Sequence, residues 1–121
     1  MSDCVFCGIV NGEYPSTKIY EDDYVLAFLD TNPITKLHTL VVPKKHYANF
    51  YDIPEAELKH LMVGVKRVVL LLQKDGVNAV NVLHASGVEA QQSVFHFHLH
   101  VVPRRKDDNL DHFILPKMLR S

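Results

Sequence analysis

The sequence predicts an α+β fold in which one helix packs on a mainly antiparallel sheet, within a single domain spanning residues 1–121. Two observations support this prediction. Strand-like segments greatly outnumber helical ones, and short loops join them. The 121 residues are 47% hydrophobic and 22% charged, an ordinary globular composition that can bury one core without a disulfide.

Five segments have the composition of strands. Each is short, rich in β-branched or aromatic residues, and bounded by turn-forming residues. In chain order they cover residues 18–20, 24–29, 38–43, 77–85 and 93–103. The segment SGVEAQQ is predicted to be a loop, and residues 104–121 form a C-terminal tail.

The one predicted helix runs from Pro54 to Lys74. Asp52 is expected to cap it, with Glu55 as the reciprocal partner, and Gly76 is expected to end it. A stripe of apolar residues recurs at helical spacing and should face the sheet. It comprises Leu58, Leu61, Met62, Val65, Val68, Val69 and Leu72.

Charge and hydropathy exclude several classes of function. The formal net charge is -1, so no basic field argues for binding long nucleic acid. The N-terminus lacks the features of a signal peptide, and the longest apolar run, VVLLL, is too short to cross a bilayer. We therefore expect a cytoplasmic protein that binds no membrane, in which a structural disulfide is not expected.

Three of the eight histidines lie in the segment HFHLH, residues 96–100. Because side chains alternate between the faces of a strand, His96, His98 and His100 share one face, while Phe97 and Leu99 share the other. The apolar face should enter the core. The histidine face must then meet solvent, bind a metal or line a site, and strict alternation argues against a chance cluster on a wet face.

Two chemical interpretations of the histidines remain. One is a catalytic metal bound by all three, but residues i and i+4 of an extended strand lie roughly 14 Å apart. The other is covalent catalysis, in which an imidazole attacks an electrophilic phosphorus and forms a temporary phosphoramidate. The geometry favours the second interpretation, with the middle histidine as nucleophile and the outer two as donors to phosphate oxygens or to the leaving group.

The segment HFHLHVV is similar to the signature of the histidine triad (HIT) superfamily. The blocks CVFCGIVNGEYPSTKIYEDDYVLAFLDTNP, HTLVVPKKHY and QSVFHFHLHVVPR resemble that family in the same order over nearly the whole chain. The resemblance implies a five-stranded antiparallel sheet, usually in a homodimer whose sheets join. It also implies a nucleotide hydrolase or nucleotidyl transferase acting at an α-phosphate, as a phosphoramidase or a dinucleoside polyphosphate hydrolase.

The resemblance also implies roles for individual residues. His98 is the nucleophile, His100 and Ser93 contact the phosphate or the leaving group, and His38 completes the catalytic cluster with His96. The residues implied to bind a purine nucleotide are Asp30 for the ribose hydroxyls, with Val5, Phe6, Phe28, Thr31 and Gln92. From the residues alone, a turn role is the preferred interpretation of Asp30, whereas core packing and a base pocket account equally well for Phe28.

This chain departs from the family pattern at two positions. Ala85 stands where an Asn or Gln usually contacts the phosphate, and Gln91 stands where a glycine is common. The VVPR segment after the triad resembles the dinucleotide-hydrolase and bacterial branches. A nucleotide-binding interaction module with little catalysis is therefore the alternative to an enzyme.

The motif CVFC, with Cys4 and Cys7, supplies half of a tetrahedral zinc site. A redox pair needs a preceding strand, for which there is no room, and two ordinary small hydrophobic residues are the remaining alternative. Resemblance to family members that carry this pair implies His46 and His96 as the other ligands of a structural Zn2+. Spacing alone does not select His46 over His60 or His112.

Val63 and Leu70 form a second apolar strip on the predicted helix, away from the first. Since a helix with two apolar faces usually buries both, this strip predicts a homodimer. The alternative is that the C-terminal FILPKML covers the strip within one chain.

Overall fold

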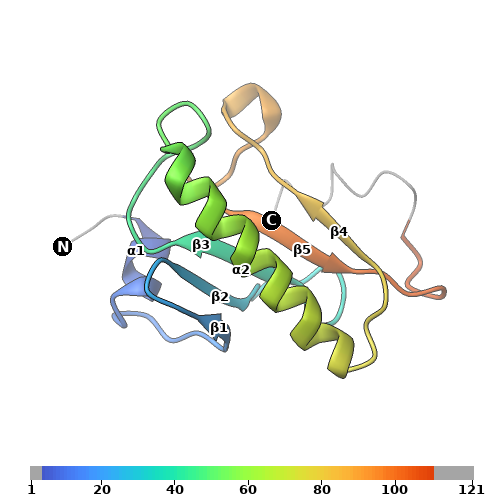
Figure 1. The fold of residues 1–121 in the computed structure, drawn as a ribbon. Helices are drawn as coiled ribbons and strands as arrows, with labels where there is room; N and C mark the ends of the chain where they lie inside the picture. The colour runs from blue at the N-terminus through green and yellow to red at the C-terminus, as the bar shows by residue number, and fades with distance from the viewer. Residues whose placement is uncertain (1–3, 111–121) are drawn as a thin grey trace.

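The computed structural model describes residues 4–110 and has the predicted α+β architecture (Figure 1). Its elements in chain order are α1 (Val5–Val10), β1 (Lys18–Glu21), β2 (Val25–Leu29), β3 (Thr39–Pro43), α2 (Glu55–Lys74), β4 (Val80–Leu83), the 3-10 turn η1 (Val88–Ala90) and β5 (Leu99–Pro103). The strands form one antiparallel sheet in the order β1-β2-β3-β5-β4. The histidine-bearing strand β5 therefore lies inside the sheet, between β3 and β4.

The two faces of the sheet are covered by different elements. Helix α2 crosses one face, as Figure 1 shows, and the N-terminal segment with α1 covers part of the other. Alternate residues of β2 and β3 supply the two cores, as period-two side-chain placement requires. The α2 side buries Val25, Ala27, Val41, Leu61, Val65, Val68, Leu72, Phe97, Leu99 and Val101. The opposite side buries Phe6, Leu26, Phe28, Leu40 and Val42.

Helix α2 confirms most of the predicted stripe and corrects two details. Met62 is 57% exposed, although the pattern assigned it to the stripe. Asp52 does not cap the helix, because its carboxylate accepts hydrogen bonds from the backbone N–H groups of Ala48 and Asn49 at 3.1 and 3.0 Å. Pro54 is the N-cap instead. Gly76 ends the helix as predicted, with a φ of 88° that suits glycine.

The predicted boundaries of the last strand are wrong. Residues 93–98 lie outside the sheet ladder, and β5 begins only at Leu99. Strand β4 is also shorter than the predicted segment 77–85. The apolar and polar alternation nevertheless continues through residues 97–101, because Phe97, Leu99 and Val101 all pack on the α2 side.

Helix α1 was not predicted from the sequence. Six residues are too few to form a stable helix alone, so tertiary contacts must hold it. Its N-cap is Cys4, whose Sγ accepts a hydrogen bond from the N–H of Cys7 at 3.4 Å. Phe6 is buried against the sheet, and the ring of Tyr14 lies so close to Gly8 that a Cβ there would clash with it.

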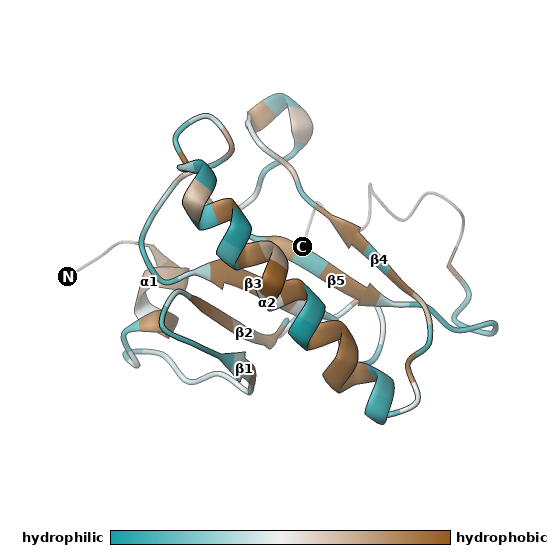
Figure 2. Cartoon of the chain, viewed as in Figure 1, coloured by the Kyte–Doolittle hydropathy of each residue, from teal (hydrophilic) through white to brown (hydrophobic). Residues whose placement is uncertain are grey.

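The predicted second strip of α2, Val63 and Leu70, is 52% and 41% exposed. Figure 2 shows brown apolar bands alternating with teal ones along this helix. The FILPKML segment, proposed above as a cover, lies outside the described residues. Within residues 4–110, neither helix combines the length and apolar character that a bilayer span requires.

Candidate active site and metal centre

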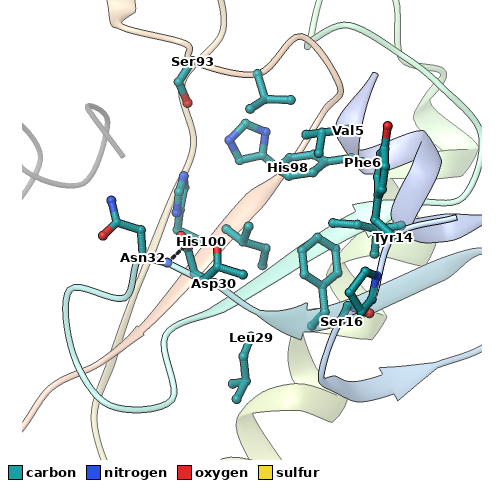
Figure 3. A pocket seen from close by; sticks show the side chains of 16 residues that line it. Val5, Phe6, Tyr14, Ser16, Leu29, Asp30, Asn32, Ser93, His98 and His100 are labelled. Carbon is teal, nitrogen blue, oxygen red and sulfur yellow. Dashed lines mark hydrogen bonds between the residues drawn. The ribbon is translucent and has the colours of Figure 1, made fainter. Parts of the chain in front are cut away.

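A cavity of about 330 Å³ opens beside the second and third histidines of the HFHLH segment. It brings together many of the residues that the sequence singled out (Figure 3). The predicted residues that line it are Val5, Phe6, Phe28, Asp30, Thr31, Ser93, His98 and His100. In Figure 3, Ser93, His100 and Asp30 lie on one side of the cavity, and Val5, Phe6 and Tyr14 on the other.

The hydrogen bond made by His98 determines which of its ring nitrogens can react. Its Nδ1 lies 2.8 Å from the carbonyl oxygen of His96, and a carbonyl can only accept, so Nδ1 carries the proton. The lone pair of the neutral ring is then on Nε2. Burial is the main cause that lowers the pKa of His98 below its ordinary value, so the neutral ring is favoured.

A second chain of hydrogen bonds orients His100. The N–H of Ile34 donates to Nδ1 of His38 at 3.2 Å, so the His38 proton is on Nε2. That Nε2–H donates to Nδ1 of His100 at 3.0 Å, which leaves an Nε2–H on His100 as a donor. Burial and the neighbouring His98 lower the pKa of His100 to about 3, so this donor is neutral.

Asp30 closes a turn and also lines the cavity. Its Oδ1 accepts the N–H of Asn32 at 2.9 Å, which closes a turn after β2. Its Oδ2 lies 3.6 Å from Nε2 of His38 and lines the cavity. The carboxylate is therefore held by the turn while one edge faces the cavity.

The apolar wall of the cavity is aromatic. Phe6 meets Phe28 edge to face at 5.7 Å between ring centroids, and meets His98 in the same way at 5.1 Å. Phe28 is only 3% exposed, so it belongs both to the core and to the wall. Such a wall suits a flat, mostly apolar group.

His96 points away from this cavity into a separate cluster with Cys4, Cys7 and His46. All four candidate ligand atoms lie within 4.8 Å of one another. Nδ1 of His96 lies 3.4 Å from each Sγ and 3.2 Å from Nδ1 of His46, which is 3.3 Å from Sγ of Cys7. Ligand atoms around a tetrahedral zinc lie roughly 3.3–3.8 Å apart, so the spacing fits such an ion.

The tautomer of His96 also suits a metal ligand. Its Nε2 donates to the carbonyl oxygen of Pro43 at 2.8 Å, so the lone pair of the neutral ring is on Nδ1, inside the cluster. Two sulfurs and two nitrogens are a common donor set for structural zinc. His60, an alternative from spacing, lies instead against Tyr24 with its ring stacked at 3.5 Å. The other alternative, His112, lies outside the described residues.

The HIT domain profile matches residues 11–107, which is most of the chain. The chain belongs to the HIT family. It is 50% identical to a HIT-like protein of Methanocaldococcus jannaschii over 105 residues, which cover 87% of this chain and 81% of that one. It is 38% identical to the adenylylsulfatase HINT3 of Arabidopsis thaliana over 110 residues, covering 90% of this chain but only 56% of the plant protein.

A zinc-bound HIT protein of known structure also resembles this chain. It is a histidine triad family protein from Mycobacterium smegmatis, with a TM-score of 0.85 and 36% sequence identity. The match covers 98% of this chain and 91% of that one. The likeness agrees with the five-stranded antiparallel HIT fold seen here and is compatible with zinc at the Cys4 cluster.

Within the HIT site, Gln92 occupies a different place from the one expected for a nucleotide ligand. It does not line the cavity, and its side-chain amide donates to the carbonyl oxygens of Ala48 and Val94 at 2.6 and 3.0 Å. Its Oε1 accepts the N–H of Gly87 at 2.8 Å. Gln92 therefore organises the loop before the triad.

The two departures from the HIT pattern have different consequences. Ala85 is buried beside Val102 and offers no side-chain donor. Gln91 has a φ of 68°, a conformation that glycine adopts without strain. This backbone conformation explains why a glycine is common at the position. His84 and Ser86 flank Ala85, but they bond to each other and do not line the cavity.

Half of the cavity lining was not singled out from the sequence. These residues are Ile9, Tyr14, Pro15, Ser16, Leu29, Asn32, Leu40 and Val94. The spacing of four between Val5 and Ile9 indicates a helical turn and could have identified α1 as a wall. Nothing local marks Tyr14 or Ser16, which lie in the connection between α1 and β1 and reach the site only through the tertiary fold.

Proposed function

We propose that this protein is a nucleotide hydrolase or nucleotidyl transferase that acts at the α-phosphate of a nucleoside monophosphate group. The reaction passes through a covalent nucleotidyl-His98. The observation that carries the proposal is the hydrogen bond from Nδ1 of His98 to the carbonyl oxygen of His96, because it leaves the Nε2 lone pair for attack.

In the first step the lone pair on Nε2 of His98 forms a bond to the α-phosphorus as the bond to the leaving group breaks. The leaving group departs with that electron pair and takes a proton from water in the cavity, while the Nε2–H of His100 donates a hydrogen bond to the charge that develops on the phosphoryl oxygens. In the second step water attacks phosphorus and loses a proton to solvent as the bond between phosphorus and Nε2 breaks, which releases a nucleoside monophosphate and neutral His98 with its Nδ1 proton kept. Transfer to another acceptor in place of water gives the nucleotidyl transferase reaction.

The remaining cavity residues bind and orient the nucleotide. Ser93 and His100 donate to phosphate oxygens, and Asp30 accepts from both ribose hydroxyls. The base lies against Phe6 and Phe28, with Val5 and Thr31 at its edge. We propose purine nucleotides or dinucleoside polyphosphates as partners.

We further propose that Cys4, Cys7, His46 and His96 hold one structural Zn2+ per chain. Bound there, the ion joins the N-terminal segment to the loop after β3 and to the triad segment. It offers no open position for a substrate when all four ligands are engaged. Phe6 lies between the two cysteines, so the same cross-link holds the aromatic wall in place.

A nucleotide-binding module with little catalysis is the second candidate. Ala85 favours it, since the phosphate loses a donor that other family members supply. The Nε2–H of His100 and the hydroxyl of Ser93 keep two donors, so we rank this candidate below the enzyme.

Trapping the intermediate tests the proposal. The protein is mixed with a panel of adenosine and guanosine phosphoramidates and dinucleoside polyphosphates, then quenched rapidly in alkali. Mass spectrometry should show one added nucleoside monophosphate on the peptide that contains His98. Turnover with no trapped adduct points to direct hydrolysis, and binding with no turnover points to the module.

We also propose a homodimer that buries the exposed strip of α2, while the cytoplasmic location stays a prediction. Light scattering should give twice the chain mass of 13.8 kDa. Replacing Val63 and Leu70 together with Glu should give monomers, because burying two carboxylates is costly. Val88→Glu, at a residue 71% exposed on η1, is the matched control. A monomer mass for the unaltered protein contradicts the proposal.

A further inference from the structure

The nucleophile segment, residues 96–98, lies just before β5 and outside the sheet ladder. Peptide groups there need partners other than a neighbouring strand. The N–H of Phe97 donates to the carbonyl oxygen of Tyr47 at 2.6 Å. The carbonyl oxygen of His96 accepts from the His98 ring, as described above. The third group, the carbonyl oxygen of His98 itself, is bound by His84.

The hydrogen bonds of His84 define its tautomer. Its Nδ1 lies 2.9 Å from the carbonyl oxygen of His98, so Nδ1 carries a proton and donates it. Its Nε2 accepts from the hydroxyl of Ser86, and Oγ of Ser86 in turn accepts the N–H of Phe50 at 3.0 Å. A continuous chain of hydrogen bonds thus runs from the turn at Phe50 to the peptide of the nucleophile.

Packing holds the His84 ring in the same position. The ring stacks on Phe97 at 4.3 Å between centroids with an interplanar angle of 24°. Phe50 meets His84 edge to face at 4.5 Å. His84 is not among the residues that line the cavity, and its contact with the nucleophile segment is the hydrogen bond to the His98 carbonyl.

We propose that His84 is a positioning residue for the nucleophile. Its Nδ1–H donates to the peptide carbonyl of His98 and holds it in position. Its Nε2 accepts from Ser86, which connects the turn at Phe50 to the same segment. The inference rests on the proposed role of His98. A misplacement of about 1 Å at a reacting group can cost on the order of 10²-fold in rate, which sets the size of the expected effect.

Two amide substitutions test the hydrogen bonds of the two ring nitrogens of His84 one at a time. In His84→Asn the carboxamide nitrogen stands close to where Nδ1 was, so it can donate to the His98 carbonyl while the bond to Ser86 is lost. In His84→Gln the amide reaches Ser86 and loses the His98 carbonyl. His84→Phe keeps the stacking on Phe97 and loses both hydrogen bonds. His60→Phe, at a stacked histidine on α2, is the matched control.

The turnover experiment compares kcat with the Kd of the nucleoside monophosphate product. His84→Gln and His84→Phe should lower kcat about 10- to 100-fold with Kd changed less than about threefold. His84→Asn should keep kcat within a few-fold of the unaltered protein. Equal kcat for the Asn and Gln variants overturns the proposal. So does a fall in kcat that parallels the fall in melting temperature across all the variants.

A second readout does not depend on activity. The ¹³C resonance of the His98 carbonyl, in protein labelled at that residue, reports the hydrogen bond from His84. It should move in the Gln variant and stay in place in the Asn variant. If the unaltered protein turns over no substrate, the proposed function fails, and the carbonyl resonance still decides whether His84 holds that peptide. A resonance that is identical in all variants overturns the inference.

Discussion

His96 and His98 stand two residues apart on the same side of the chain, yet they belong to different sites. Nε2 of His96 is bonded to the carbonyl oxygen of Pro43, so its Nδ1 faces two cysteines. Nδ1 of His98 is bonded to the carbonyl oxygen of His96, so its Nε2 is left for the cavity. The comparison shows that the backbone carbonyl bound by each imidazole determines which ring nitrogen carries the proton. The other nitrogen then keeps the lone pair and can bind a metal or attack a substrate.

The largest expected effect is on kcat, and it distinguishes His98 from His96 directly. His98→Ala should lower kcat by about three orders of magnitude or more, with product binding largely kept, because it removes the proposed nucleophile. His60→Ala is the control at a histidine remote from both sites. Steady-state kinetics with the substrates identified above measure the effect. Near-normal turnover by His98→Ala contradicts the assignment.

His96→Ala sharpens the contrast, because its main loss should be metal and stability rather than chemistry. Zinc content should fall from about one per chain, and kcat should fall far less than in His98→Ala. Elemental analysis and melting temperature are the measurements. If His96→Ala lost as much kcat as His98→Ala while remaining folded, the division of roles between them would be wrong.

The cysteine pair gives a test of the metal centre that leaves the triad intact. Cys4→Ser with Cys7→Ser, or a chelator, should remove zinc, lower the melting temperature and weaken nucleotide binding through the Phe6 wall. Zinc binding should also weaken as pH falls, since thiolates and neutral imidazoles take up protons. Zinc that survives the double substitution would point back to a three-histidine metal site.

The smallest expected effect concerns acid stability. Burial, together with the neighbouring His98, His38 and His84, lowers the pKa of His100 to about 3, well below its ordinary value of 6.5. Asp30 acts in the opposite direction on His38, whose pKa burial also lowers. The unfolded chain therefore binds more protons than the folded one, so this stability is present above pH 6.5 and is lost as pH falls toward 3.

One such histidine contributes a slope approaching about 1.4 kcal/mol per pH unit. His100→Gln should flatten the dependence of the unfolding free energy on pH by up to this amount, whereas His60→Gln should leave it unchanged. Urea unfolding at pH 7, 6 and 5 measures both. An unaltered slope in His100→Gln would show that this ring does not stay neutral in the fold.

The sequence predicted the sheet and α2 well because their signals are local. Alternation separates Phe97 and Leu99 from the histidines, and apolar spacing of three and four marks α2. The predicted start of the last strand failed, because loop contacts to Tyr47 and His84 replace the ladder there. The Asp52 cap failed because its carboxylate closes the preceding loop instead.

By itself the sequence determined which residue types are available and which face each one takes: three alternating histidines, a cysteine pair and an amphipathic helix. Only the tertiary structure decided their partners. It put His46 rather than His60 beside Cys7 and drew the Gln92 amide into a loop. It also placed the lone pairs of His96 and His98 on opposite ring nitrogens and left His100 with an N–H donor. The physical reason is that these outcomes depend on hydrogen bonds between residues up to 92 positions apart, such as that of Cys4 with His96, which no local pattern encodes.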